Sequence, residues 1–468
     1  MSDFAQLIEE HKSRGQHFSA RRPIFISRAP GRLDLMGGNV DYSGGLVFEA
    51  PIREATWAAA QLRDDDLICL VNPQMAESGW QAQVERPLAS VDDEQDLRSF
   101  VNQSPSTRWT AYVLGVFHWL RKRWPVEASR GITVFLRSEV PLNKGVSSSA
   151  AVEVATMKAA AAAYGIELKG IELAEACQWV ENVIAESACG IMDQATSVLG
   201  KQGHILPLLC QPCQLSEPVR LPEDFSLWAI DSGAKHEVTG IEYEAARAAG
   251  FVGYGMICGW EGIPTRFDET GSIPRYTDPR WNGYLCNLSP SAFRSLYEMR
   301  LPETVSGDEL LRAGATHPDP FTQIRSGVTY RVRNCTRYAV EEHQRIELFV
   351  ELLRGSEQAA SERVGRLLGD LMLQSHWSYT ECGLGAKATD KIIALVREEL
   401  GPQKLYGAKI TGGGAGGTVA VLGSSDAQAS FNRVVERYAE HLGAEPYVFT
   451  GSSQGADEFG IQILAVTA

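Results

Sequence analysis

The chain has 468 residues, and its 44 Lys and Arg against 58 Asp and Glu give a formal net charge of −14. A hydrophobic fraction of 44 % is typical of globular proteins and excludes a largely disordered chain. The acidic balance argues against nucleic-acid or anionic-membrane partners, because both select for surfaces rich in Lys and Arg. A local anion site built from a few backbone N–H groups is compatible with this charge.

The nine cysteines are scattered and form no disulfide framework. Cys210 and Cys213 have CxxC spacing without a second pair or a thioredoxin-like context, so two reduced thiols in a turn are the better interpretation. The polar N-terminus, MSDFAQLIEEHKSR, does not resemble a signal peptide, and the sequence has no run of about 20 apolar residues. We expect a soluble, cytoplasmic protein that is a monomer or a homodimer.

The N-terminal half alternates strand and helix patterns. Residues 1–20 predict a short amphipathic helix, and residues 24–27 predict a strand that ends in a turn at Ala29-Pro30-Gly31. Alternating apolar residues predict strands within 55–71 and 80–86. The further predicted elements are a helix at 109–122, a strand at 131–138, helices at 150–163 and 171–185, and a strand at 227–231.

The C-terminal half begins with a different texture. Residues 255–330 are rich in Pro, Trp and Arg and predict a loop-rich insertion with short helices. Helical spacing returns at 339–373 and 388–400, and strands, a glycine-rich loop and a helix follow. Strands and helices that mix without a regular βαβ repeat favour an α+β fold with mixed sheets. We expect two domains, an N-terminal one over 1–225 and a C-terminal one over 226–468.

The segment PLNKGVSSSAAVEVAT joins a serine-rich loop to an Ala-rich helix. Ser147–Ser149 lie at or near the N-cap of this helix, where unpaired N–H groups and the helix dipole can hold a phosphate. A serine hydroxyl can also reach a Mg²⁺ ion on the phosphates. Plain helix capping by one serine is the alternative.

A glycine-rich loop near the C-terminus contains the pattern GxGxxG at Gly412, Gly414 and Gly417. A dinucleotide-binding fingerprint opens a helix, whereas the strand-like TVAVLG follows here. We therefore favour a glycine hairpin whose backbone approaches a ligand closely.

Two further segments carry charges among small or apolar residues. In APGRLDLMGGNVDYSGG, Arg32 and Asp41 are candidate functional residues, and an ordinary solvated loop charge is the alternative for each. In CGIMDQ, Asp193 stands among apolar neighbours, and a buried, paired Asp that stabilises the fold is the alternative to a catalytic role.

These loops, in this order and spacing, resemble the GHMP small-molecule kinases. The two charged segments, WTAYVLGV and Tyr243 in IEYEAAR resemble its galactokinase branch, and KGVSSSAAVEVAT, GYLCNLSP and SHWSYTECGLG are similar to the L-arabinokinase group. The resemblance implies a two-domain GHMP kinase fold with the active site in the cleft between the domains. It also implies phosphorylation of the anomeric hydroxyl of L-arabinose, with ATP and Mg²⁺, to give L-arabinose 1-phosphate and ADP.

Carried over residue by residue, the resemblance makes Asp193 the base at the anomeric hydroxyl, with Arg32 beside it. The implied sugar-binding set is Arg32, Gly38, Asn39, Asp41, Asp193 and Tyr243. Ser149 and Glu181 would hold Mg²⁺, and a solvated helix face is the alternative for Glu181. The implied ATP-binding set is Lys144, Gly145, Val146, Ser147, Ser148, Ser149, Ala150, Gly413 and Gly414.

Gly38 departs from the galactokinase pattern Gly-Glu-His-x-Asp, in which the Glu receives the 6-hydroxyl of the sugar. L-Arabinopyranose is galactose without the C6 hydroxymethyl group, so a Glu there would be left unpaired at a cost of roughly 1–3 kcal/mol. Gly38 therefore favours L-arabinose over D-galactose, unless the glycine is kept for its backbone conformation.

Other functions stay open at this stage. They are a galactokinase, a kinase of a related hexose or uronic acid, and a non-catalytic regulator that binds sugar and ATP. Trp57 and Trp109 are candidate walls of an adenine pocket, although core packing is the simpler interpretation for both.

Overall fold

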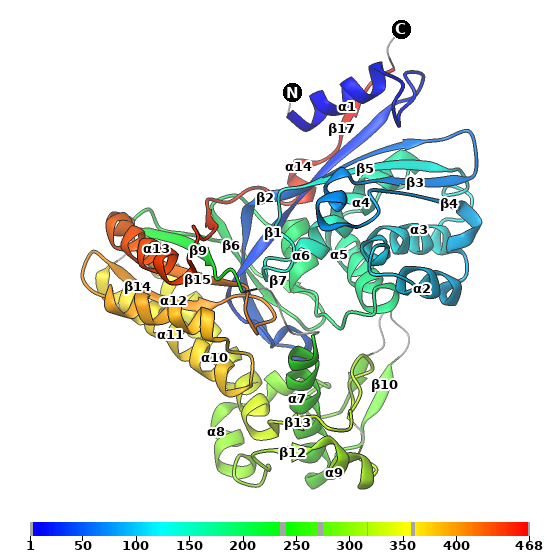
Figure 1. Ribbon diagram of the computed structural model, residues 1–468. Helices are drawn as coiled ribbons and strands as arrows, with labels where there is room; N and C mark the ends of the chain where they lie inside the picture. The colour runs from blue at the N-terminus through cyan, green and yellow to red at the C-terminus, as the bar shows by residue number, and fades with distance from the viewer. Residues whose placement is uncertain (1–2, 235–239, 269–274, 316, 357–360, 467–468) are drawn as a thin grey trace.

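The structure is a computed structural model that describes residues 3–234, 240–268, 275–315, 317–356 and 361–466 (Figure 1). The strands are β1 (Ile24–Met36), β2 (Leu46–Leu62), β3 (Leu67–Val71), β4 (Gln83–Pro87), β5 (Ile132–Ser138), β6 (His204–Leu209), β7 (Gln214–Leu215), β8 (Val219–Arg220), β9 (Phe225–Asp231), β10 (Arg266–Asp268), β11 (Arg275–Thr277), β12 (Val305–Ser306), β13 (Thr329–Tyr330), β14 (Leu405–Ile410), β15 (Thr418–Ser424), β16 (Val448–Thr450) and β17 (Gln462–Leu464). The α-helices are α1 (Asp3–Ser13), α2 (Glu94–Asn102), α3 (Ala111–Arg123), α4 (Ser148–Tyr164), α5 (Gly170–Trp179), α6 (Met192–Leu199), α7 (Ile241–Trp260), α8 (Pro290–Ala292), α9 (Gly307–Arg312), α10 (Val332–Arg354), α11 (Glu362–Glu381), α12 (Lys387–Glu398), α13 (Gln428–Leu442) and α14 (Ala456–Phe459).

The larger sheet has the strand order β17-β1-β2-β5-β3-β4, and β6 also pairs with β2. Its pairs are antiparallel apart from β3 and β5, which run parallel. The Ala-rich helix α4 packs directly on β1 and β2, because its small side chains allow a close approach. Helices α3 and α5 pack on α4 in turn. The mixture of sheets and helices confirms the predicted α+β class.

Strand β1 continues through the segment where the sequence predicted a turn. The prediction of a turn at Ala29-Pro30-Gly31 is wrong, because Pro30 pairs with Ala55 of β2 within the sheet. The register shifts between Pro30 and Arg32. Pro has no N–H to donate to the ladder, and a local irregularity accommodates it. Arg32 therefore lies on a buried strand rather than in a loop.

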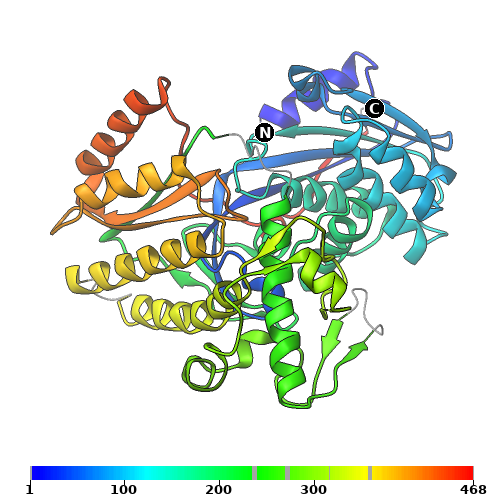
Figure 2. The same ribbon diagram turned by 60° about the horizontal axis from the view of Figure 1, so that its bottom comes forward.

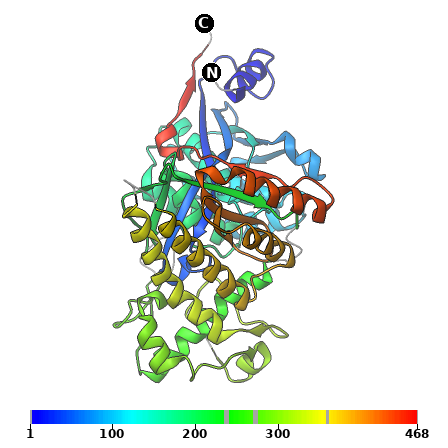
Figure 3. The ribbon, with the colours of Figure 1, turned by 90° about the vertical axis from the view of Figure 1, so that its left-hand side faces the viewer.

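The smaller sheet has the order β14-β15-β9-β16. Helices α11 and α12 pack against it, and α13 lies beside α12 (Figure 3) and stacks Phe431 on Trp228 of β9. The helix predicted at 339–373 is two helices, α10 and α11, and both pack along each other. In chain order the smaller sheet begins with β9, and the division into domains 1–225 and 226–468 stays a prediction. Strand β17 returns the chain to the edge of the larger sheet, near α1 (Figure 1).

Residues 255–330 begin in the last turns of α7, and the elements that follow α7 among their described residues are short, as their composition predicted. They surround α7 at the end of the molecule that comes forward in Figure 2. None of the helices in the described part of the chain has the length and hydropathy needed to cross a membrane. The nine cysteines form no disulfide bond, which agrees with the interpretation of their spacing.

Candidate active site

A cleft of about 600 Å³ opens beside the N-terminus of α4. Arg32, Asp41, Asp193 and Tyr243 line its polar end, and Ser147–Ser149 line its middle. Its wall combines the larger sheet and its helices with α7 and the loop between β14 and β15. The cleft thus draws residues from both halves of the chain.

Arg32 and Asp193 form an ion pair in this cleft. The Arg32 Nε and Nη2 atoms lie 2.9 and 2.7 Å from Asp193 Oδ1, and Nη1 donates to the Gly145 carbonyl at 2.8 Å. Nε is also 3.2 Å from Glu49 Oε2. Burial opposes the charge of Arg32, but the carboxylates of Asp193 and Glu49 raise its pKa, so the guanidinium stays protonated.

The serine-rich loop ends at Ser147, the N-cap residue of α4. Ser147 has a left-handed backbone, with φ 59° and ψ 50°, and its side chain makes no capping hydrogen bond. Its buried Oγ has no partner in the described part of the chain. Ser148 and Ser149 follow in the first helical turn and line the cleft. Unpaired N–H groups in the first turn and an unpaired hydroxyl are better explained by an anion site than by plain helix capping.

The glycine-rich loop near the C-terminus joins two antiparallel strands, β14 and β15. This confirms a hairpin and excludes the dinucleotide fingerprint, which requires a helix. Gly412 has φ +69°, and a Cβ there would come within 2.6 Å of the Gly145 carbonyl. The hairpin therefore packs directly on the serine-rich loop, and Gly413 and Gly414 line the cleft.

Glu181 lies in a π-helical turn, η5 (Val180–Ile184), that follows α5. It is 5 % exposed, which excludes a solvated helix face. Burial, and next the charge of Asp193, raise its pKa to about 7, while hydrogen bonds with Ser149 and Gln194 oppose this rise. Gln194 Nε2 donates to Glu181 at 2.6 Å and to the fully buried Glu153 at 3.2 Å.

Ser149 and Glu181 offer the hard oxygen atoms that Mg²⁺ requires. No group of three or more His, Cys, Asp or Glu side chains in the described residues suits a metal ion by itself. Mg²⁺ usually keeps several waters and takes one or two protein carboxylates together with substrate phosphates. A hydroxyl and a single carboxylate beside an anion site fit that pattern.

Asp41 begins the short helix η1 (Asp41–Ser43) at the polar end of the cleft. Its Oδ1 accepts a hydrogen bond from the Tyr42 N–H at 2.8 Å. Burial, and next the charge of Asp193, raise the pKa of Asp41 to about 7. The ring of Tyr243 meets the ring of Tyr42 edge-on at 6.1 Å between centroids. Asp41, Asp193 and Tyr243 can therefore accept and donate hydrogen bonds around one small polar ligand.

Gly190→Ala is expected to displace the Asp41 carboxylate. A Cβ at residue 190 would stand 1.8 Å from Asp41 Oδ2, so the carboxylate must move. We expect the KM for the small polar ligand to rise about tenfold or more, which corresponds to one lost hydrogen bond to a charged group. Steady-state kinetics check this, with Gly259→Ala as the control because a Cβ there meets nothing within 4 Å. An unchanged KM would remove Asp41 from the binding site.

Several residues of the implied sets do not line the cleft. Lys144 turns its Nζ to Asp231, at 2.9 Å. Val146 and Ala150 are buried, and the Val146 carbonyl accepts from the Arg32 N–H at 3.1 Å. Gly38 is covered by the ring of Tyr379. Asn39 borders a separate small internal cavity.

The sequence identified only one side chain of the apolar end of the cleft. Of the two candidate tryptophans, Trp109 lines this end, whereas Trp57 stacks on Phe4, with the centroids 5.5 Å apart. Further apolar side chains of the lining include Met75, Trp80, Tyr112 and Leu142. They come from separate elements, and their spacing in the sequence is that of ordinary core residues. Glu153 was also missed, because a single Glu within an Ala-rich helix carries no signal.

Three family models match the chain. The GHMP kinases N terminal domain matches residues 111–201, the galactokinase galactose-binding signature matches 15–62, and the GHMP kinases C terminal domain matches 356–440. An L-arabinokinase of Arabidopsis thaliana is 36 % identical over 500 residues, which cover 97 % of this chain and 48 % of that protein. The chain thus spans about half the length of this relative.

Galactokinases are similar over their whole length. The galactokinase of Chloroflexus aurantiacus is 28 % identical over 443 residues and 94 % of each chain. The structure of Lactococcus lactis galactokinase complexed with galactose matches with a TM-score of 0.74 and 20 % identity, over 97 % of this chain and 99 % of that one.

The two domain matches define the class: the chain carries the N- and C-terminal domains of the GHMP kinases, and it shares the fold of a galactokinase. Its residues 15–62 match the galactose-binding signature of the galactokinases. The signature contains Arg32 and Asp41, the two residues of the first charged segment that line the cleft.

Proposed function

We propose that the chain is an ATP-dependent sugar 1-kinase that phosphorylates the anomeric hydroxyl of L-arabinose. The observation that carries the proposal is the Arg32–Asp193 ion pair beside the N-terminus of α4. A carboxylate and a guanidinium stand there next to an anion site, in a chain of the galactokinase branch. The similarity to the Arabidopsis thaliana L-arabinokinase supports the choice of sugar.

Asp193 orients the anomeric hydroxyl and accepts its proton. Its side chain is 19 % exposed while that of Arg32 is 3 % exposed, so the carboxylate is the more accessible of the two to a ligand in the cleft. Phosphoryl transfer passes through a loose transition state, in which positioning and charge stabilisation outweigh proton removal. Arg32 holds Asp193 in place and offsets negative charge on the transferring group.

The serine-rich loop and the glycine hairpin hold the nucleotide phosphates. The N–H groups of the first turn of α4 and the Ser147 hydroxyl bind phosphate oxygens, and Gly413 and Gly414 cover them. Ser149 and Glu181 hold Mg²⁺, which when bound neutralises charge on the phosphates. The apolar end of the cleft, with Trp109 and Tyr112, suits a planar base.

Gly38 bears on the choice between pentose and hexose in two ways. It offers no carboxylate to a 6-hydroxyl, as the sequence indicated. In addition, a Cβ at residue 38 would come within 2.8 Å of Tyr379 Cε2, and the Tyr379 hydroxyl is fixed by a hydrogen bond to the Gly412 carbonyl at 2.5 Å. With φ +45° at Gly38, a Gly38→Glu variant would be strained and would clash, so it is a poor test of specificity.

The unmodified protein provides the test. We expect kcat/KM for L-arabinose to exceed that for D-galactose roughly tenfold or more, because the 6-hydroxyl finds no carboxylate partner at Gly38 and the hydroxymethyl group needs additional room. D-Fucose, which is galactose without the 6-hydroxyl, separates these causes. Turnover of D-fucose close to that of L-arabinose indicates the missing partner, and its rejection indicates a lack of room for C6. A preference for D-galactose would contradict the substrate assignment.

The alternatives are each weakened by a particular observation. A uronic acid would need an uncompensated positive charge, whereas Arg247, buried behind Asp41, already makes two hydrogen bonds with Asp319. A non-catalytic regulator would be expected to lack part of the site, whereas Arg32 and Asp193 are paired in the cleft. A galactokinase is the closest alternative, and the sugar comparison above distinguishes it.

A further inference from the structure

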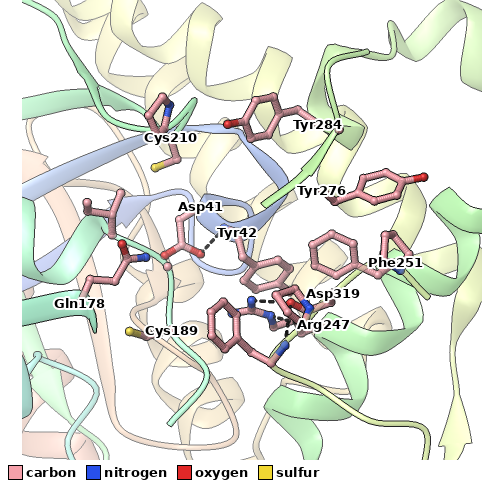
Figure 4. A pocket seen from close by; sticks show the side chains of 17 residues that line it. Asp41, Tyr42, Gln178, Cys189, Cys210, Arg247, Phe251, Tyr276, Tyr284 and Asp319 are labelled. Carbon is pink, nitrogen blue, oxygen red and sulfur yellow. Dashed lines mark hydrogen bonds and ion pairs between the residues drawn. The ribbon is translucent and has the colours of Figure 1, made fainter. Parts of the chain in front are cut away.

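A second cavity, of about 110 Å³, lies behind Asp41 (Figure 4). Asp41, Cys189 and Gly190 line both this cavity and the main cleft. The opposite wall includes Arg247 of α7 and Asp319 of the segment 255–330. Asp41 therefore stands between the candidate sugar site and a cavity that the loop-rich segment helps to build.

Arg247 and Asp319 form a buried, two-pronged ion pair in that wall. Arg247 Nε donates to Asp319 Oδ2 and Nη2 donates to Oδ1, both at 2.8 Å. The two residues are 3 % and 5 % exposed. Thr322 Oγ1 donates to Asp319 Oδ2 at 2.6 Å, and Arg247 Nη1 has no partner in the described part of the chain. Two parallel hydrogen bonds fix the plane of the guanidinium.

A chain of contacts connects this pair to the sugar site. Arg247 lies one helical turn after Tyr243 on α7, and its guanidinium lies over the ring of Tyr42, 4.7 Å from the centroid. Tyr42 in turn meets Tyr243 edge-on and donates its N–H to Asp41. Asp319 thus anchors Arg247, and Arg247 holds Tyr42, the residue next to Asp41.

We propose that Arg247, anchored by Asp319, is a positioning residue for sugar recognition: it holds the Tyr42–Asp41 segment and supplies the positive charge that keeps Asp41 able to accept hydrogen bonds from sugar hydroxyls. Through Asp319, the segment 255–330 takes part in the sugar site without touching the sugar. This proposal rests on the proposed sugar kinase function.

The charges around Asp41 determine the direction in which a substitution should shift the pH dependence of sugar recognition. Burial and the carboxylate of Asp193 raise the pKa of Asp41, and Arg247, the Tyr42 N–H and Arg32 oppose that rise. A carboxylate with a raised pKa is ionised only above it, so sugar recognition weakens as the pH falls through about 7. The titratable and charged groups that interact with Asp41 among the described residues are Arg32, Cys189, Asp193, Cys210, Tyr243, Arg247, Cys286 and Tyr379.

The test is the pH dependence of kcat/KM for the best sugar substrate in four proteins. Arg247→Met removes the positive charge, so the midpoint of the pH profile, which reflects ionisation of Asp41, is expected to move upward by about one pH unit. Arg247→Lys keeps the charge and is expected to restore the midpoint. Asp319→Asn removes the opposing negative charge and is expected to move the midpoint downward. The KM for ATP and kcat at saturating sugar and high pH stay within about twofold of the unmodified protein.

Arg325→Met is the matched control. Arg325 also belongs to the segment 255–330 and forms an ion pair with Glu244 of α7, but it lines neither cavity. We expect this variant to keep the unmodified midpoint. If Arg247→Met does not fold, the downward shift expected for Asp319→Asn still gives the sign.

Identical midpoints of the pH profiles in all variants would overturn the positioning role. Equal losses of kcat/KM for the sugar and for ATP would also overturn it and leave a structural role. An unmodified protein without sugar-dependent turnover would instead contradict the proposed function itself, so the two failures are distinguishable.

Discussion

Asp193→Asn is expected to lower kcat for sugar phosphorylation by about 10²–10⁴-fold, the usual contribution of a positioned general base. The amide has nearly the same shape as the carboxylate, but it cannot accept the proton of the anomeric hydroxyl. The KM for ATP is expected to change little, because the phosphates contact the serine-rich loop instead. Initial rates of ADP release at saturating sugar and ATP check this expectation.

The fold should survive the Asp193→Asn substitution. Arg32 keeps the carboxylate of Glu49 at 3.2 Å and the carbonyl of Gly145 at 2.8 Å, so its charge stays compensated. Asp457→Asn is the matched control, because Asp457 accepts from the Gly170 N–H at 2.6 Å and pairs with Lys158 away from the cleft. Turnover of Asp193→Asn close to that of this control would remove Asp193 as the base.

Arg32→Ala is expected to abolish turnover and also to destabilise the fold by about 3–5 kcal/mol, as is usual when one partner of a buried ion pair is removed. Glu49 is fully buried, and burial, and next the charge of Asp34, raise its pKa well above the usual range, while the charge of Arg32 opposes this rise. Without Arg32, Glu49 has to take up a proton or remain as an uncompensated buried charge. Denaturant unfolding measures the loss of stability, and ADP release measures the loss of turnover.

Arg32→Lys separates the two effects of Arg32. A lysine keeps the positive charge near Glu49 but cannot contact Asp193, Glu49 and the Gly145 carbonyl together as the planar guanidinium does. We expect most of the stability to return while kcat stays at least tenfold below that of the unmodified protein. The control is Arg28→Ala, because Arg28 lies on the same strand but does not line the cleft, and it donates to Ser453 and the Arg53 carbonyl instead. Full turnover of Arg32→Lys would show that charge alone is sufficient.

The sequence predicted those parts of the site that depend on local motifs. The serine-rich loop at a helix N-terminus and the glycine hairpin each follow from a short run of residues with one favoured conformation. The predicted partners Arg32 and Asp193 meet in the cleft because their motifs lie on β1 and at the start of α6. The bulge that carries β1 through Pro30 was not predicted, because Ala-Pro-Gly is equally typical of a turn.

The parts that depend on contacts between distant segments could not be predicted. Tyr379 covers Gly38 only because α11 packs near β1, and Asp319 meets Arg247 only because the segment 255–330 folds around α7. The π-helical turn that directs Glu181 inward also has no sequence signature. In each case the side chain resembles an ordinary surface or core residue until its partner is known.

The most direct test of the account is ADP release by the purified protein with MgATP and L-arabinose, with the product examined by ³¹P NMR. We expect ADP release that requires the sugar and Mg²⁺, one equivalent of ADP per sugar consumed, and a phosphate ester at the anomeric carbon. ADP release that is independent of any sugar, or a phosphate on another hydroxyl, would contradict it.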